Sequence, residues 1–131
     1  MLIFRIENEE GQGPWTGCLP TLHTGPWAER HLATWSECRK LYRDGVIDEK
    51  KFNSINRWMD RHHSNWFCCF ANKKQLRSIV YPRELRYALV NNPDFYLGVY
   101  RVHGRYVRQL QQQSVFLRDK ATLIRKIRFS R

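Results

Sequence analysis

Five consecutive apolar residues, Trp66–Phe70, interrupt the middle of a chain that is otherwise rich in polar and charged side chains. Such a run is driven out of water, and it is too short to form a helix of ordinary length. It therefore predicts a buried β-strand. Helical spacing precedes this strand and β-forming residues follow it, so we expect a chain that mixes helices and strands.

The segments before the apolar run predict one strand and a pair of helices. Apolar residues alternate over Leu2–Ile6, which is typical of a strand. Helical spacing begins near Thr24 and continues to about Arg43. Gly45 is placed to end this helix, and Asp48 is placed to cap the next one. The two helices are expected to pack as a hairpin through apolar stripes made of Leu32, Trp35, Cys38 and Tyr42 on the first and Phe52, Ile55 and Met59 on the second.

Two short helices are expected after the apolar run. Asn72 and Gln75 have the spacing of a capping box, so they predict a helix over Lys73–Val80. Pro82 interrupts the helical pattern because it cannot donate a backbone hydrogen bond within a helix. We therefore expect a separate helix over Arg83–Val90.

The rest of the chain predicts antiparallel strands. Phe95–Val102 and Arg105–Phe116 are rich in β-forming residues and flank the dipeptide His103-Gly104, which predicts a hairpin with a two-residue turn. A last strand is expected over Leu123–Phe129. Its core-facing residues would be Leu123, Ile127 and Phe129, with Arg125 on the same face as an exception.

These elements define an α+β fold with an N-terminal strand, central helices and a C-terminal antiparallel sheet. A chain of 131 residues has room for one hydrophobic core, so we expect residues 1–131 to form a single domain. No apolar run reaches the roughly 20 residues that cross a bilayer. The N-terminal residues turn acidic without a cleavage signal, so we expect a cytoplasmic protein.

The charge of the chain is concentrated in its second half. The formal net charge is +11, yet residues 1–66 contain nine Lys or Arg and nine Asp or Glu and are neutral overall. Residues 67–131 contain fourteen Lys or Arg and three Asp or Glu. Because crowded like charges repel and destabilise a fold, this asymmetry indicates a contact face for an acidic partner.

Arginine dominates the basic half. Its planar guanidinium pairs with phosphate through two hydrogen bonds and stacks on bases, and tyrosines at positions 87, 96, 100 and 106 are interleaved with it. We therefore predict binding to nucleic acid or to a nucleoprotein complex, and the alternative is a structural or interaction protein for an acidic protein partner. The residues expected at this surface are Lys73, Lys74, Arg77, Arg83, Arg86, Arg101, Arg105, Arg108, Arg125, Lys126 and Arg128, and Arg118 belongs to the same basic segment.

The cysteines are expected to be free thiols that bind no metal. A set with suitable ligand types for zinc consists of Cys18, His23, His31 and Cys38. Its spacing is not a standard one, and Cys38 already fits an apolar helical stripe. The adjacent pair Cys68-Cys69 lies within the apolar run, and the four cysteines lack the spacing of a secreted disulfide scaffold.

Three short motifs resemble those of a group of small bacteriophage proteins. The motifs are Phe4–Asn8 followed by Gly11–Trp15, Trp66–Leu76, and Gln113–Phe116. Members of the group have Gly where Cys69 stands and Ser where Asn72 stands, so the chain departs from them at the middle motif. The resemblance implies a phage protein in the host cytoplasm, where inhibition of a host defence system is one expected role.

The linear order of these motifs is also similar to that of ADP-ribosyltransferases, which gives an alternative function. The resemblance implies that Arg5 would hold the phosphates of NAD and that Phe70 and Asn72 would line the nicotinamide pocket. Gln113 would stand where the catalytic glutamate is expected, and an amide cannot stabilise a developing oxocarbenium charge as a carboxylate does. This alternative requires Arg5 and Gln113 to lie on one side of a common cleft. Without it, no cofactor is expected.

Overall fold

The computed structural model describes residues 1–11, 30–62, 65–80, 89–111 and 113–129, with only the backbone described for residues 30–36 and 78–80. Along these segments the elements are β1 (Leu2–Glu7), α1 (Arg30–Arg43), α2 (Glu49–Arg61), β2 (Trp66–Cys69), α3 (Lys73–Val80), β3 (Tyr96–Arg101), β4 (Val107–Gln109), β5 (Ser114–Leu117) and β6 (Thr122–Arg128). Two short 3-10 turns, η1 (Gly104–Tyr106) and η2 (Arg118–Lys120), precede β4 and β6. The predicted α+β fold, with an N-terminal strand, helices and antiparallel strands, is confirmed.

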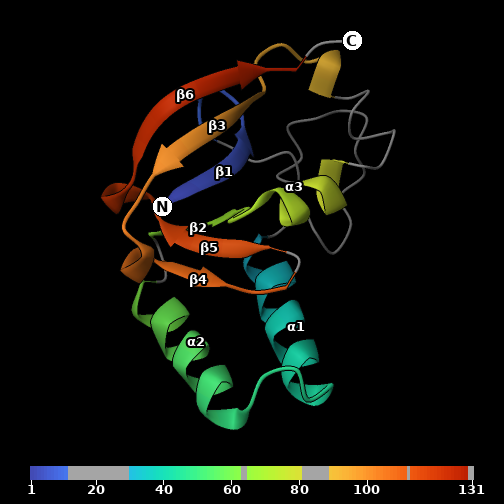
Figure 1. Cartoon of the computed structure of the whole chain (residues 1–131), viewed down its shortest axis with the longest axis vertical. Helices are drawn as coiled ribbons and strands as arrows, with labels where there is room; N and C mark the ends of the chain where they lie inside the picture. The colour runs from blue at the N-terminus through green and yellow to red at the C-terminus, as the bar shows by residue number, and fades with distance from the viewer. Residues whose placement is uncertain (12–29, 63–64, 81–88, 112, 130–131) are drawn as a thin grey trace.

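The described strands form two antiparallel sheets of three strands each, in the orders β1-β3-β6 and β2-β5-β4. An isolated bridge joins the sheets, since Phe4 and Phe70 exchange backbone hydrogen bonds of 2.8 and 2.7 Å. Figure 1 shows β6, β3 and β1 above β2, β5 and β4, with α1 and α2 below the second sheet. The N-terminal strand and the apolar central strand are therefore neighbours in space.

The chain between β3 and β4 does not form the predicted hairpin. β3 lies between β1 and β6, whereas β4 pairs with β5. The two-residue turn expected here needs positive φ angles, and neither His103 nor Gly104 has one. Instead η1 carries the chain from one sheet to the other and buries Val102 and Val107, which are 3% and 6% exposed. Burial of these two side chains between the sheets is the physical reason for the difference.

The hairpin of α1 and α2 has the predicted boundaries at its turn. α1 ends at Arg43, and Gly45 adopts a φ of 74°, a left-handed conformation that costs other residues energy. The Asp48 carboxylate caps α2 by accepting a hydrogen bond of 2.8 Å from the Lys51 N–H. The predicted start of the first helix near Thr24 lies outside the described residues.

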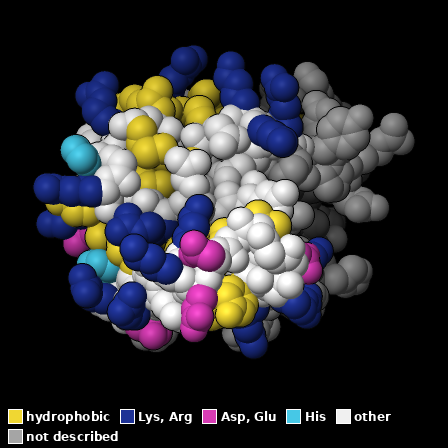
Figure 2. All heavy atoms as spheres, turned by 60° about the horizontal axis from the view of Figure 1, so that its bottom comes forward, with side chains coloured by type: hydrophobic (Ala, Val, Ile, Leu, Met, Phe, Trp, Pro, Cys, Tyr) yellow, Lys and Arg dark blue, Asp and Glu magenta, His cyan; other side chains and the backbone are white. Residues whose placement is uncertain are grey.

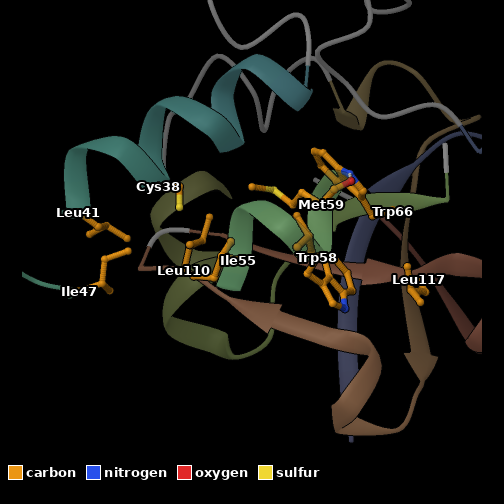
Figure 3. Close-up of a cluster of buried hydrophobic side chains, with 10 residues drawn as sticks. Cys38, Leu41, Ile47, Ile55, Trp58, Met59, Trp66, Leu110 and Leu117 are labelled. Atoms are coloured by element: carbon orange, nitrogen blue, oxygen red, sulfur yellow. Dashed lines mark hydrogen bonds between the residues drawn. The ribbon is translucent and has the colours of Figure 1, made fainter. Parts of the chain in front are cut away.

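A buried cluster joins this hairpin to the second sheet. Its members, shown in Figure 3, are Cys38, Leu41, Ile47, Ile55, Trp58, Met59, Trp66, Leu110, Val115 and Leu117. The Trp66 indole donates a hydrogen bond of 3.0 Å to the Met59 carbonyl oxygen, so its polar atom is satisfied in the core. Tyr42 was predicted in the buried stripe but is 41% exposed, and Leu41 is buried instead. The Tyr42 ring lies 4.7 Å from that of Phe52, where its hydroxyl keeps access to water.

β6 has nearly the predicted bounds, but the prediction that it faces the core is wrong for two of three residues. All seven residues of the strand are exposed, including Leu123 and Ile127 at 37% each. Phe129, just beyond the strand, is partly buried and packs against a cluster that contains Phe70. The outer strand of a three-stranded sheet has fewer neighbours than the central one, which is why its apolar side chains stay in contact with water.

A bulge in β6 separates Arg125 from Leu123, although Arg125 still shares a face with Ile127. The register shifts between Val99 and Tyr100 of β3. Their partners in β6 are Arg125 and Leu123, respectively. Because successive residues of a strand face opposite sides of the sheet, the bulge places Arg125 and Leu123 on opposite faces.

α3 begins at the predicted cap, and its capping glutamine also contacts the second sheet. The Gln75 N–H donates to the Asn72 side chain at 2.9 Å, while the Gln75 side-chain oxygen accepts from the Ala71 N–H at 2.8 Å. Gln75 is 3% exposed, and its side-chain nitrogen donates to the Leu110 carbonyl oxygen at 2.8 Å. Its side-chain oxygen also accepts from the Ser114 hydroxyl at 2.9 Å. Gln75 therefore ties α3 to the turn between β4 and β5.

Replacing Gln75 by leucine is expected to lower the free energy of unfolding by about 2–3 kcal/mol, because buried carbonyl and hydroxyl groups lose their partner. Denaturant unfolding followed by circular dichroism measures the loss. The control is Gln109→Leu, an equal change at an exposed position of β4. Equal stability of the two variants would show that water satisfies the groups that Gln75 now binds.

The predicted helix over residues 83–90 lies outside the described residues except for its last two positions. Among the helices that the structure does describe, none has the length and apolar character required to cross a membrane.

Candidate nucleic-acid interface

The residues predicted to bind nucleic acid are divided among three elements. α3 carries Lys73, Lys74 and Arg77, β6 carries Arg125, Lys126 and Arg128, and Arg101, Arg105 and Arg108 lie around η1. Arg83 and Arg86 lie outside the described residues. In Figure 1, β6 is at the top, α3 is at the right, and η1 precedes β4 at the left. The basic half of the sequence is therefore distributed over the fold and does not form one sheet face.

The group around η1 combines cations with an aromatic ring. The Arg105 guanidinium carbon lies 4.7 Å from the centroid of the Tyr106 ring, and the Lys120 ammonium lies 5.9 Å from the same centroid. The His103 ring meets Tyr106 edge-on, with centroids 6.3 Å apart. Arg101 ends β3 and pairs with Thr122, which follows η2 closely. We call Arg101, His103, Arg105, Tyr106, Arg108 and Lys120 the Tyr106 patch.

Local hydrogen bonds fix the shape of this patch. The His103 ring accepts from the Arg105 N–H at 3.2 Å, which caps η1. The Arg108 guanidinium donates to the Arg105 and Val107 carbonyl oxygens at 2.9 and 3.0 Å and lies 5.1 Å from the Trp58 ring centroid. Partial burial lowers the pKa of Arg108, but a guanidinium stays charged at neutral pH. Arg108 therefore supports the patch, while Arg105 and Lys120 are exposed at its surface.

The positive charge of the patch is not neutralised within the described part of the chain. None of its four cations forms an ion pair with a described Asp or Glu. By contrast, Lys126 and Arg128 of β6 both pair with Glu9, the former at 2.7 Å. On the face of the molecule seen in Figure 2, dark blue Lys and Arg side chains are widespread, with hydrophobic atoms between them and fewer acidic groups. Such a surface suits an anionic partner.

A second cluster of charges lies buried between the sheets around Glu7, which is 0% exposed. Its carboxylate pairs with Arg5 at 3.0 Å and with Arg118 at 2.8 Å. The hydroxyls of Tyr96, at 3.0 Å, and of Tyr100 also donate to it. Burial, together with this carboxylate, raises the pKa of Tyr96 to about 12 and raises that of Tyr100 as well. Both hydroxyls therefore stay protonated and keep donating.

The residues of the enzyme alternative all have structural contacts. Arg5 is 5% exposed, and besides its pair with Glu7 it donates to the carbonyl oxygens of residues 68 and 11 at 2.8 and 3.1 Å. Phe70 forms the bridge between the sheets, and Asn72 caps α3. Gln113 is 9% exposed, and its carbonyl oxygen accepts from the Leu110 N–H at 3.0 Å. These contacts favour structural roles, while a common cleft for Arg5 and Gln113 stays a prediction.

Comparison with protein-family models places the chain among known proteins. The model described as bacteriophage T4 Y00F protein matches residues 1–130. The chain belongs to this family. The family match confirms the resemblance to small bacteriophage proteins, which rested on short motifs. Comparisons with curated proteins and with solved structures gave no significant match, and none of the three supports a resemblance to ADP-ribosyltransferases.

Two residues of the patch in this Y00F-family protein were not singled out by the sequence. His103 stands in the dipeptide that the sequence predicts as a turn, and Lys120 stands between two predicted strands. They meet at Tyr106 because η1 and η2 end at the same side of the two sheets, and no linear motif joins positions so far apart. The sequence also did not single out Glu7, the last residue of β1. Glu7 begins a run of acidic residues, and nothing in the neighbouring sequence distinguishes it from the exposed Glu9.

The described cysteines of this phage protein are free thiols. Cys38, Cys68 and Cys69 form no disulfide, and burial raises the pKa of the Cys38 and Cys69 thiols, so these two stay protonated and unreactive at neutral pH. Cys18, His23 and the side chain of His31 lie outside the described residues, so the absence of zinc stays a prediction.

Proposed function

We propose that this phage protein binds nucleic acid, alone or within a nucleoprotein complex, through the Tyr106 patch. The observation that supports the proposal most directly is that Arg105 and Lys120 approach one aromatic ring without a described carboxylate partner. A phosphate pairs with such cations through charge-assisted hydrogen bonds, and an unpaired base stacks on an aromatic or guanidinium plane.

The charge of the whole chain supports the same partner. A formal charge of +11 attracts a polyanion over a long range, and the cations of α3 add to the field around the patch. Because the family is one of phage proteins, we further propose that the target is a nucleic-acid-handling complex in the host cytoplasm. Inhibition of a host defence system is the role that we propose for this binding.

The test is the salt dependence of binding to a labelled single-stranded oligonucleotide, measured by fluorescence anisotropy between about 50 and 200 mM salt. Each phosphate contact releases counterions, so four contacting cations give a slope of log K against log salt of about −3. Poly-glutamate of matched charge is the competing polyanion. Absence of binding at the lowest salt contradicts the proposal, and equal affinity for poly-glutamate would favour an acidic protein partner.

A further inference from the structure

The outer edge of β6 pairs with no other strand in the described part of the chain. β6 is the last strand of the order β1-β3-β6, and all seven of its residues are exposed. In Figure 1 it forms the upper rim of the molecule, with β3 on its inner side. Because a strand at the edge of a sheet keeps backbone N–H and C=O groups unpaired on its outer side, it can pair with another extended chain.

The side chains of β6 combine apolar surface with positive charge. Leu123, Ile124 and Ile127 are 37%, 42% and 37% exposed, although residues of this kind are usually buried. The other long side chains of the strand are Arg125, Lys126 and Arg128, and β6 contains no acidic residue. An incoming strand would therefore gain both apolar contact and charge pairing if it alternates acidic and apolar residues.

The cations of β6 lie on both faces of the sheet. Arg125 pairs with Val99 across the ladder, whereas Lys126 and Arg128 lie on the opposite face beside Tyr96. The pairing with Glu9 shows that a carboxylate reaches Lys126 and Arg128 in this geometry. On the other face, Arg125 has no ion pair with a described residue.

From this combination we propose that β6 accepts an acidic, extended segment of a partner protein as an additional β-strand. Backbone hydrogen bonds would supply affinity, and glutamate or aspartate side chains on one face of the incoming strand, opposite Arg125, would supply specificity. This site is distinct from the Tyr106 patch and does not depend on nucleic-acid binding.

A second copy of the chain fits the same edge poorly. Antiparallel pairing of β6 with itself about its centre would set Arg125 opposite Arg125 and bring all six cations of the two strands together, with no acidic residue in either strand. Like charges placed opposite each other destabilise a strand pair. Charge complementarity therefore favours an acidic partner over self-association.

The test uses the full chain and an octapeptide in which glutamate alternates with valine. NMR shifts of the backbone amides are expected to change mainly at residues 122–128 when this peptide is added, and the β6 amides should become protected from hydrogen exchange. A peptide with lysine in place of glutamate should not bind. A glutamate peptide that is N-methylated at alternate residues should bind at least about tenfold more weakly, because it lacks donors on one edge.

Two charge-matched double variants separate this site from the proposed nucleic-acid site. Arg125→Glu with Lys126→Glu should abolish peptide binding and leave most oligonucleotide binding. Arg105→Glu with Lys120→Glu should strongly weaken oligonucleotide binding and leave most peptide binding. Unchanged peptide affinity after N-methylation would overturn the proposal in favour of charge attraction alone. Loss of oligonucleotide binding in the β6 variant would assign this edge to nucleic acid. A dimer with contacts at β6 would show that a second copy of the chain occupies this edge, which would overturn the proposal. No peptide binding at all would also overturn it and would show that the β6 cations serve another purpose, such as protecting the edge from aggregation.

Discussion

Glu7→Gln is expected to lower the free energy of unfolding by about 3–5 kcal/mol, because it removes the charge that compensates two guanidinium groups between the sheets. Glu7 is completely buried, and Arg5 and Arg118 lie 3.0 and 2.8 Å from its carboxylate. The amide keeps the size of the carboxylate but leaves the two positive charges unpaired and places a donor beside other donors. Denaturant unfolding followed by far-UV circular dichroism measures the change.

The chain offers a matched control for this substitution. Glu9 also pairs with two cations, Lys126 and Arg128, but it lies on the surface. Glu9→Gln should therefore change stability little, since water screens exposed ion pairs. If the two variants were equally stable, the cluster around Glu7 would have to be open to water, contrary to the complete burial of Glu7 in the structure.

Arg105→Glu with Lys120→Glu is expected to weaken oligonucleotide binding about a hundredfold at low salt, since two charge-assisted contacts of about 1.5 kcal/mol each are lost. The slope of log K against log salt should become shallower, because the variant forms fewer phosphate contacts and its binding releases fewer counterions. Both side chains are exposed, so the fold should be retained. Arg108 is a poorer choice than the sequence suggests, because its contact with Trp58 and two carbonyl oxygens gives it a structural role.

The control for this pair is Lys50→Glu with Lys51→Glu at the start of α2. It changes the net charge equally at exposed positions, and acidic residues are favourable at a helix N-terminus. The control should retain most of the affinity. Equal losses in both double variants would show that binding follows net charge alone, without a defined site at Tyr106.

Local chemistry was enough to predict several elements of the fold from the sequence. Asp48 and Asn72 cap α2 and α3 as their positions indicate, because a capping side chain acts on backbone groups two or three residues away. The apolar run Trp66–Phe70 became β2 and the bridge residue that follows it. These features depend on neighbours in the chain, so a single sequence contains the information.

Partners that are distant along the chain were not predictable in the same way. The sequence shows β-forming residues on both sides of His103 and Gly104, but it does not show that the strands belong to different sheets. Likewise the bulge that separates Leu123 from Arg125 depends on the register against β3. Both outcomes follow from which apolar side chains reach the shared core, and that is a property of the assembled fold.

The sequence by itself determined the excess of positive charge, the α+β class, the helix caps and the apolar central strand. The tertiary structure decided which charges are available to a partner. It buried Glu7 between Arg5 and Arg118, paired Lys126 and Arg128 with the one carboxylate of Glu9, and left the cations around Tyr106 without a described carboxylate. The physical reason is that composition fixes how many charges a chain carries, whereas pairing and burial depend on distances that only folding sets.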